Sequence, residues 1–191
     1  MTRDELYKEL QGVNHSREKR HECSTLIMEN TYLIPKLLDI MFMVDDNVSP
    51  KAGWVMEFLC NRDVNFIIDH LNQFTENIHR VHQDSAVRPV AKLCELIAIA
   101  YSSNENTQMK KALRPTYKER IIETCFDYMI NDEKIAPKAY AMNTLFLLGK
   151  ETDWIHPELT LIIERDYKMQ SSGFKARARH ILKKIKKDNH L

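Results

Sequence analysis

The stretch APKAYAMNTLFLLG, residues Ala136 to Gly149, decides the fold. Ala139, Met142, Leu145 and Phe146 recur at the three- and four-residue spacing of one helical face. Gly149 stands where such a helix would end. The stretch therefore predicts a helix that is buried inside an all-helical protein.

The start of this helix, a basic residue followed three positions later by a residue that packs inward, recurs along the chain. The copies are Lys51 with Trp54, Arg88 with Ala91, Lys138 with Ala141, Lys175 with Ala178, and a fainter Arg17 with Arg20. Successive basic residues stand 34, 37, 50 and 37 positions apart. This period is typical of helix-pair repeats, which must stack because one pair cannot bury both of its faces.

Internal similarity supports a duplicated helix–turn–helix unit. Residues 49–71 and 136–163 share Pro-Lys-Ala, an apolar helix, a polar turn that contains Asp, and a second apolar helix. We expect repeat helices to start near residues 14, 49, 86, 136 and 173.

Local signals define the segments between these helices. Asn14 is the predicted N-cap of the first repeat helix, and Asp63 that of one long helix that continues to about residue 81. The polar segment 102–114 interrupts the repeat period, so we expect an inserted surface loop with at most one helical turn, which should tolerate deletion.

Composition restricts the function classes. The chain has only 4 Gly and 9 Met in 191 residues, and its long runs are rich in helix-forming residues. Few glycines leave little material for phosphate-binding loops or nucleophile elbows. The four cysteines are far apart within helical runs, as expected of core residues in a reducing compartment. Without a signal-like start or a long apolar run, we expect a cytoplasmic protein with no membrane partner.

The resemblance to a known family rests on DSAVRPVAKL, residues 84–93, in which an acidic turn precedes Arg88, Ala91 and Leu93. This pattern resembles the second helix of HEAT repeats, and looser copies extend it over residues 14–187 as about five units. The resemblance implies an all-α, right-handed α-α superhelix of the HEAT/armadillo type, with about ten helices in a single domain, 1–191. More narrowly, the chain resembles short helical proteins of Bacteroidetes-type bacteria that carry the label adenylosuccinate lyase. Ser171–Lys175 matches the lyase signature loop only in part, without its Met-Pro and Asn-Pro.

Three residues suggest a metal site. Glu76, His79 and His82 stand three positions apart, so on a helix they would share one face, and carboxylate with imidazole can bind a metal. Such sites need a second, facing helix with the same motif, and the chain has no other Glu-x-x-His. A solvated helix face is the preferred interpretation, and we expect neither a metal nor a cofactor.

The tryptophans and a histidine near one of them allow other interpretations. Trp54 and Trp154 could form a ligand-stacking surface, but both lie among apolar residues, so core packing is preferred. His156 stands near Trp154 and Asp153 without a nucleophile, so we expect a capping or surface group.

The basic residues at the repeat positions should pair with acidic side chains of the adjoining unit and form an internal ladder. The same helices should line the concave face of the superhelix, where a partner would dock. The candidate partner-binding residues are Lys51, Glu57, Arg88, Lys92, Glu95, Lys138 and Asn143.

Charge is uneven along the chain. Residues 168–191 contain eight Lys or Arg and one Asp, a net charge of +7, whereas residues 1–167 contain 20 basic and 26 acidic groups, a net of −6. The candidate basic patch is Lys175, Arg177, Arg179, Lys183, Lys184, Lys186 and Lys187. A helix with its cations outward is either a solvated cap of the repeat array or a surface for phosphates or an acidic protein.

Three functions follow from these observations. The first is a non-catalytic protein-interaction module, with an unidentified protein as its partner. The second is a nucleic-acid-binding or DNA-repair protein that uses the basic C-terminal helix, since HEAT-like DNA glycosylases show that this architecture can hold DNA. The third is a small enzyme, although no residue is assigned a catalytic role. The oligomeric state is left open.

Overall fold

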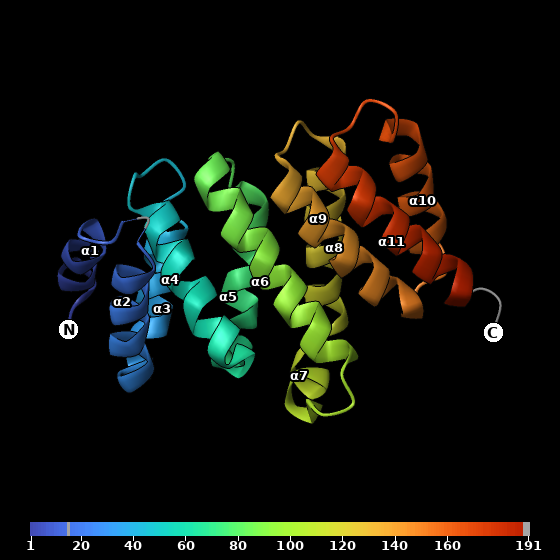
Figure 1. The fold of residues 1–191 in the computed structure, drawn as a ribbon. Helices are drawn as coiled ribbons and strands as arrows, with labels where there is room; N and C mark the ends of the chain where they lie inside the picture. The colour runs from blue at the N-terminus through green and yellow to red at the C-terminus, as the bar shows by residue number, and fades with distance from the viewer. Residues whose placement is uncertain (15, 189–191) are drawn as a thin grey trace.

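The computed structural model describes residues 1–14 and 16–188, and in this part of the chain every regular element is a helix. Eleven α-helices and four short 3₁₀ helices follow one another along the chain, and they stack side by side in two layers (Figure 1). The predicted all-α helical-repeat superhelix is therefore confirmed.

The first layer contains the helices that begin with the repeated motif. They are α2 (Arg17–Glu29), α4 (Ser49–Arg62), α6 (Asp84–Ser102), α9 (Ile135–Leu148) and α11 (Ser172–Asp188). Each of these helices packs against the next one in the series, and α6 has its most extensive contacts with α4 and α9.

The second layer covers one side of the first. It is formed by α1 (Arg3–Gln11), α3 (Ile34–Met41), α5 (Leu71–Asn77), α8 (Pro115–Ile130) and α10 (Ile155–Asp166), with 3₁₀ turns at Thr31–Leu33, Val64–His70 and Ile78–Arg80. Contacts between successive helices are weaker in this layer than in the first.

Two local expectations were wrong. The N-cap of α2 is Ser16, whose hydroxyl accepts a hydrogen bond from the Lys19 amide, and not Asn14. The segment after Asp63 is not one helix, because a 3₁₀ helix from Val64 to His70 precedes α5. Asp63 still caps the segment, and in a 3₁₀ helix residues three apart align, which places Ile67 in the core.

The segment 102–114 is more than a surface loop. It contains α7 (Thr107–Ala112), which packs against α6 and the 3₁₀ helix after Asp63. Met109 is 0% exposed, and Leu113 is also buried. The Asn106 side chain caps α7 at the Met109 amide and donates to Asn65 Oδ1 at 2.9 Å. In Figure 1 this segment lies at the lower edge of the array, next to the C-terminal end of α6.

Met109→Ala should therefore lower the free energy of unfolding by about 2–5 kcal/mol, the usual cost of removing a large buried side chain. Gln108→Ala, at the exposed neighbouring position, should change it by less than about 0.5 kcal/mol. Urea denaturation of both variants measures the difference. Equal stability of the two variants would show that the segment is a dispensable loop.

The two tryptophans differ. Trp54 is 9% exposed, as expected for a core residue, and its Nε1 donates to the Ser85 carbonyl at 3.0 Å. Trp154 is 56% exposed, so the core prediction was wrong for it. It is the N-cap of α10, and its ring stacks on the Phe126 ring at a centroid distance of 5.5 Å. This stacking covers only one face of the indole ring.

His156 is a core residue and not the expected surface group. It is 8% exposed, stacks on the Phe146 ring, and places Nε2 at 2.8 Å from the Phe146 carbonyl oxygen. A Cβ at Gly149 would lie 2.6 Å from the His156 ring, so this position requires glycine. His156 therefore locks α10 against the end of α9.

Trp54→Ala should reduce the free energy of unfolding by about 3–5 kcal/mol because it empties a buried site. Trp154→Ala should cost only about 1 kcal/mol, the size of one aromatic stack. Thermal and urea denaturation of the pair provide the comparison. A Trp54 variant as stable as the wild-type protein would contradict the packing described above.

Candidate partner-binding surface

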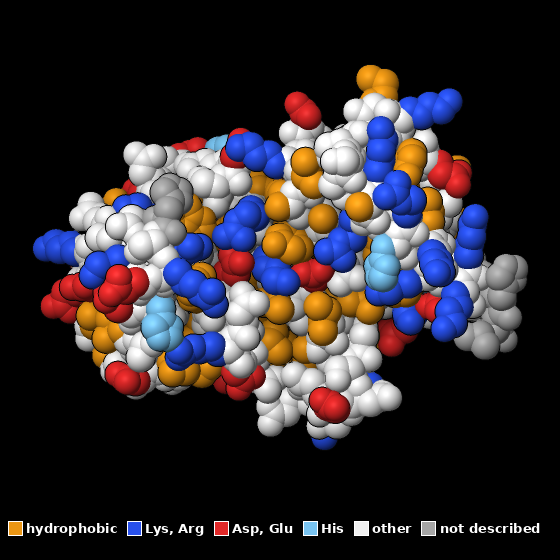
Figure 2. Space-filling view, in the orientation of Figure 1, with side chains coloured by type: hydrophobic (Ala, Val, Ile, Leu, Met, Phe, Trp, Pro, Cys, Tyr) orange, Lys and Arg blue, Asp and Glu red, His pale blue; other side chains and the backbone are white. Residues whose placement is uncertain are grey.

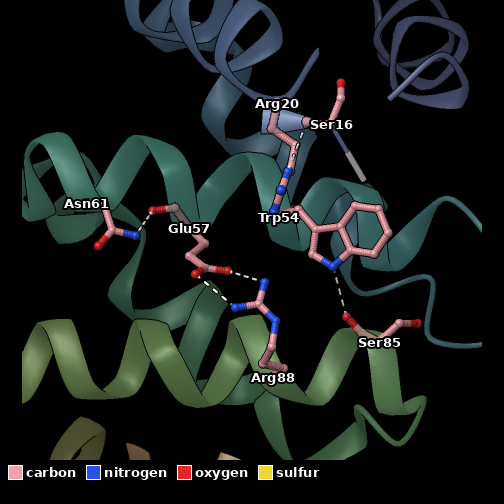
Figure 3. A network of polar contacts seen from close by, with 7 residues as sticks. All are labelled: Ser16, Arg20, Trp54, Glu57, Asn61, Ser85 and Arg88. Carbon is pink, nitrogen blue, oxygen red and sulfur yellow. Dashed lines mark hydrogen bonds and ion pairs between the residues drawn. The ribbon is translucent and has the colours of Figure 1, made fainter. Parts of the chain in front are cut away.

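One rung of the expected ion-pair ladder is present, between neighbouring repeats. Arg88 of α6 donates two hydrogen bonds to the Glu57 carboxylate of α4, at 3.0 and 2.7 Å (Figure 3). Burial lowers the pKa of Arg88, but the contacts with Glu57 and Tyr140 outweigh it, so the pKa lies above its ordinary value. The pair remains charged and rigid, because a planar guanidinium held at two points cannot rotate.

The other three basic residues of the ladder do not pair with carboxylates, and that expectation was wrong. Each ammonium group instead donates to a backbone carbonyl. Lys51 bonds to the carbonyl of Gln11 at 2.6 Å, Lys138 to that of Met129 at 3.2 Å, and Lys175 to that of Lys168 at 3.2 Å. All three carbonyls lie at or just beyond the C-terminal ends of second-layer helices, where helix carbonyls lack intrahelical partners.

These lysines therefore connect the two layers. Lys138 is only 4% exposed and its ammonium group is bound to a backbone carbonyl, so it is not available to a partner. Lys51 is half-buried, and its ammonium group is directed to the end of α1.

The remaining candidates lie together. Lys92 pairs with Glu95 at 2.7 Å, Asn143 of α9 donates to the same carboxylate at 3.0 Å, and the Lys92 ammonium lies 4.9 Å from the Tyr140 ring centroid. With the Arg88 pair they form what we call the central strip, which crosses α4, α6 and α9. The central strip consists of Glu57, Arg88, Lys92, Glu95, Tyr140 and Asn143.

The sequence analysis missed Tyr140, together with two residues that extend the strip toward α2. The Arg20 guanidinium lies 4.9 Å from the Phe58 ring centroid, and its Nε donates to the Ser16 carbonyl. In Figure 3 Arg20 extends from α2 toward Trp54. A usable signal was present for Tyr140, because it precedes Asn143 by three positions and shares its helix face.

Two clefts open beside the strip. The first, of about 810 Å³, lies between α2 and α4, and the second, of about 470 Å³, lies at the N-terminal ends of α4, α6 and α9. The first is lined by Arg17, Glu18, His21, Phe58, Asn61 and Arg62. The second is lined by Arg20, Trp54, Asp84, Ser85, Arg88, Lys134, Ala136 and Pro137.

The residues of the candidate basic patch lie on different sides of helix α11. Lys175 and Arg179 contact the Tyr167 side chain after α10, whereas Lys184 lies 5.3 Å from the ring centroid of Phe146 in α9. Arg177 and Lys187 share the α9 side with Lys184 by helical spacing, and Lys183 and Lys186 are exposed elsewhere. The apolar side of α11 packs into the array: Phe174, Ala178, Ile181 and Ile185 are buried, and Leu182 is half-buried.

Charge separates between the two layers. The five first-layer helices carry fifteen Lys or Arg and seven Asp or Glu, a net of +8. The five second-layer α-helices with their 3₁₀ turns carry seven Lys or Arg and twelve Asp or Glu, a net of −5. Figure 2 shows the first-layer side, where basic side chains crowd α11 and basic and acidic side chains alternate in the middle.

The possible metal-binding residues are dispersed. Glu76 belongs to α5, His79 to a 3₁₀ turn and His82 to the loop beyond, so they do not share one regular helix face. Glu76 pairs with Arg120 at 3.4 Å, and His82 Nε2 lies 3.2 Å from Asp45. Within residues 1–14 and 16–188, no three His, Cys, Asp or Glu side chains are arranged to hold a metal.

The cysteines are buried free thiols. Burial raises the pKa of Cys23 to about 11 and that of Cys60 still further. A hydrogen bond with Cys125, followed by burial, raises the pKa of Cys94 well above its ordinary value. These three thiols are therefore neutral near pH 7, whereas nucleophilic cysteines need the thiolate.

The folded protein should accordingly react with an aromatic disulfide reagent at least about 100-fold more slowly than the unfolded chain, in which all 4 cysteines become accessible. Absorbance of the released thiolate, with and without denaturant, measures the two rates. A rapid phase from one thiol in the folded protein would reveal a reactive cysteine and support an enzyme.

Comparison with known proteins agrees with the architecture. The model of the HEAT repeat domain matches residues 6–185, which is most of the chain. No curated protein and no solved structure matches it. Among the described helices, none combines the length and apolar character needed to cross a bilayer. The stacked helix pairs and the extent of this match place the chain in the HEAT-repeat family.

Proposed function

We propose that this protein is a non-catalytic interaction module that holds a protein partner on the first-layer side. The charge separation between the layers carries the proposal: one side has a net charge of +8 in its helices, and the other has −5. Complementary charge favours association with the correct partner and in the correct orientation.

The central strip also supports a binding site on the first-layer side. Its side chains come from three successive first-layer helices, and their ion pairs and hydrogen bonds hold them in place before any partner arrives. Binding to side chains that are already ordered costs less conformational entropy. Curved helical-repeat arrays commonly present such extended concave surfaces.

Nucleic-acid binding is the second candidate, and the net positive charge of the first layer favours it. A phosphate backbone requires cations along its whole path. In the central strip, however, Arg88 and Lys92 already neutralise Glu57 and Glu95. The proposal of a protein partner rests on this neutral middle.

We place the module in the cytoplasm. The supporting observation is that all four cysteines are free and buried, as expected where thiols stay reduced.

The test is affinity capture of cellular proteins by the tagged full-length protein and by two charge-reversed variants. Arg17→Glu with Lys187→Glu removes two exposed first-layer cations, and Lys8→Glu with Lys111→Glu is a matched control outside that layer. Both double variants change the net charge by the same amount, so a general charge effect would affect them equally. We expect the first variant alone to lose most of its captured protein, measured by quantitative mass spectrometry.

Equal capture by the two variants would contradict a first-layer site. Capture that disappears after nuclease treatment would favour the nucleic-acid alternative instead.

A further inference from the structure

We propose that the first-layer side binds an extended acidic peptide of about ten residues, with carboxylates near both of its ends. This inference rests on the proposed function and deepens it, because it specifies the chemistry of the partner. It follows from two groups of cations that are separated by a neutral middle.

The first group lies in the cleft between α2 and α4. Arg17 and Arg62 line this cleft with His21, and Arg62 Nη2 lies 3.2 Å from His21 Nδ1. Glu18 is the one carboxylate among the lining residues. We call Arg17 and Arg62 the N-terminal cationic group. Two guanidinium groups can each hold a carboxylate at two points.

The second group lies on the α9 side of α11. Arg177, His180, Lys184 and Lys187 follow the spacing of one helix face, and the contact of Lys184 with Phe146 places that face beside α9. We call Arg177, Lys184 and Lys187 the C-terminal cationic group. Lys150, just after α9, pairs with Asp188 at the end of α11, at 3.0 Å. The carboxylate of Asp188 is therefore neutralised by Lys150.

The distance between the groups sets the length of the peptide. Three helix-to-helix steps, from α4 through α6 and α9 to α11, amount to about 24–30 Å at the usual interaxial distance. An extended chain advances about 3.3 Å per residue, so about seven to nine residues bridge this distance. Two anchoring ends therefore fit a peptide of about ten residues.

The middle of the path suits a peptide backbone. Asn61 donates its side-chain amide to the Glu57 carbonyl, and Asn143 donates its amide to the Glu95 carboxylate. Each amide oxygen is an acceptor suited to a peptide N–H group. Because Glu57 and Glu95 are buried in ion pairs, this part of the path is close to neutral.

These features favour a peptide over a nucleic acid. A nucleic-acid strand carries charge throughout its length. In the described part of the chain, by contrast, the two cationic groups lie at the two ends of this surface, and Arg88 and Lys92 in its middle are ion-paired. Base stacking requires open aromatic faces. The Phe58 and Tyr140 rings already lie against Arg20 and Lys92.

The experiment is selection from a displayed library of random peptides of about twelve residues on the full-length protein, since that length exceeds the estimated span. We expect the selected sequences to be enriched in Asp or Glu at two positions about eight to ten residues apart. The best peptide, synthesised with a fluorophore, then gives dissociation constants by anisotropy at low and high salt.

Variants of each group test the two ends separately. Arg17→Glu with Arg62→Glu, and Arg177→Glu with Lys184→Glu, should each weaken binding at least about tenfold. The Lys8→Glu/Lys111→Glu control should bind like the wild-type protein. If a double variant is unstable, the exposed single changes Arg17→Glu and Lys187→Glu replace it, with a smaller loss of the same kind.

Several outcomes would overturn this inference. They are selected peptides without acidic residues at both ends, no selected peptides at all, tight binding of a duplex oligonucleotide, or salt-sensitive self-association in sedimentation through the acidic second layer. If cellular capture still depends on Arg17 and Lys187 while no acidic peptide binds, the peptide inference fails and the proposed function survives.

Discussion

The fold depends on burying helix α9 on several sides at once. This helix contacts α6 and α11 within its own layer and α8 and α10 in the second layer, so its apolar residues face neighbours in most directions. No single helix pair provides that environment, and the array must therefore extend on both sides of α9. Lys138 and His156 secure the arrangement: one connects α9 to the end of α8, and the other connects α10 to the end of α9.

Close packing within the first layer has a consequence for its charges. Side chains between neighbouring helices have little space, so Glu57 and Glu95 are buried and each is satisfied by a basic residue nearby. Such pairs add little net stability, because desolvation offsets their attraction, but they fix the positions of the groups that hold them. Arg17 and Arg62 lie toward one end of the layer, and the cations of α11 lie at the other. A surface with a rigid neutral middle and cationic ends results directly from this packing.

The candidate surface was partly predictable. Glu57, Arg88, Lys92, Glu95 and Asn143 are predicted as partner-binding residues because they lie on helices that begin with the repeated motif, and the structure brings these five together. The same argument fails at Lys51 and Lys138. Their long side chains reach backbone carbonyls of the other layer, and no spacing in the sequence reveals where those carbonyls lie. Arg20 and Phe58 were missed because their contact joins different repeats.

The sequence by itself determined the helical content, the repeat period and the residues of the first layer, because periodicity and capping are local properties of a helix. Only the tertiary structure decided which tryptophan is buried, that segment 102–114 contributes Met109 to the core, and that the metal candidates separate. It also decided the separation of charge between the layers. Most of the excess positive charge of the first layer comes from α11, a basic run that the sequence shows directly, but only the stack places this helix in one layer with α2, α4, α6 and α9.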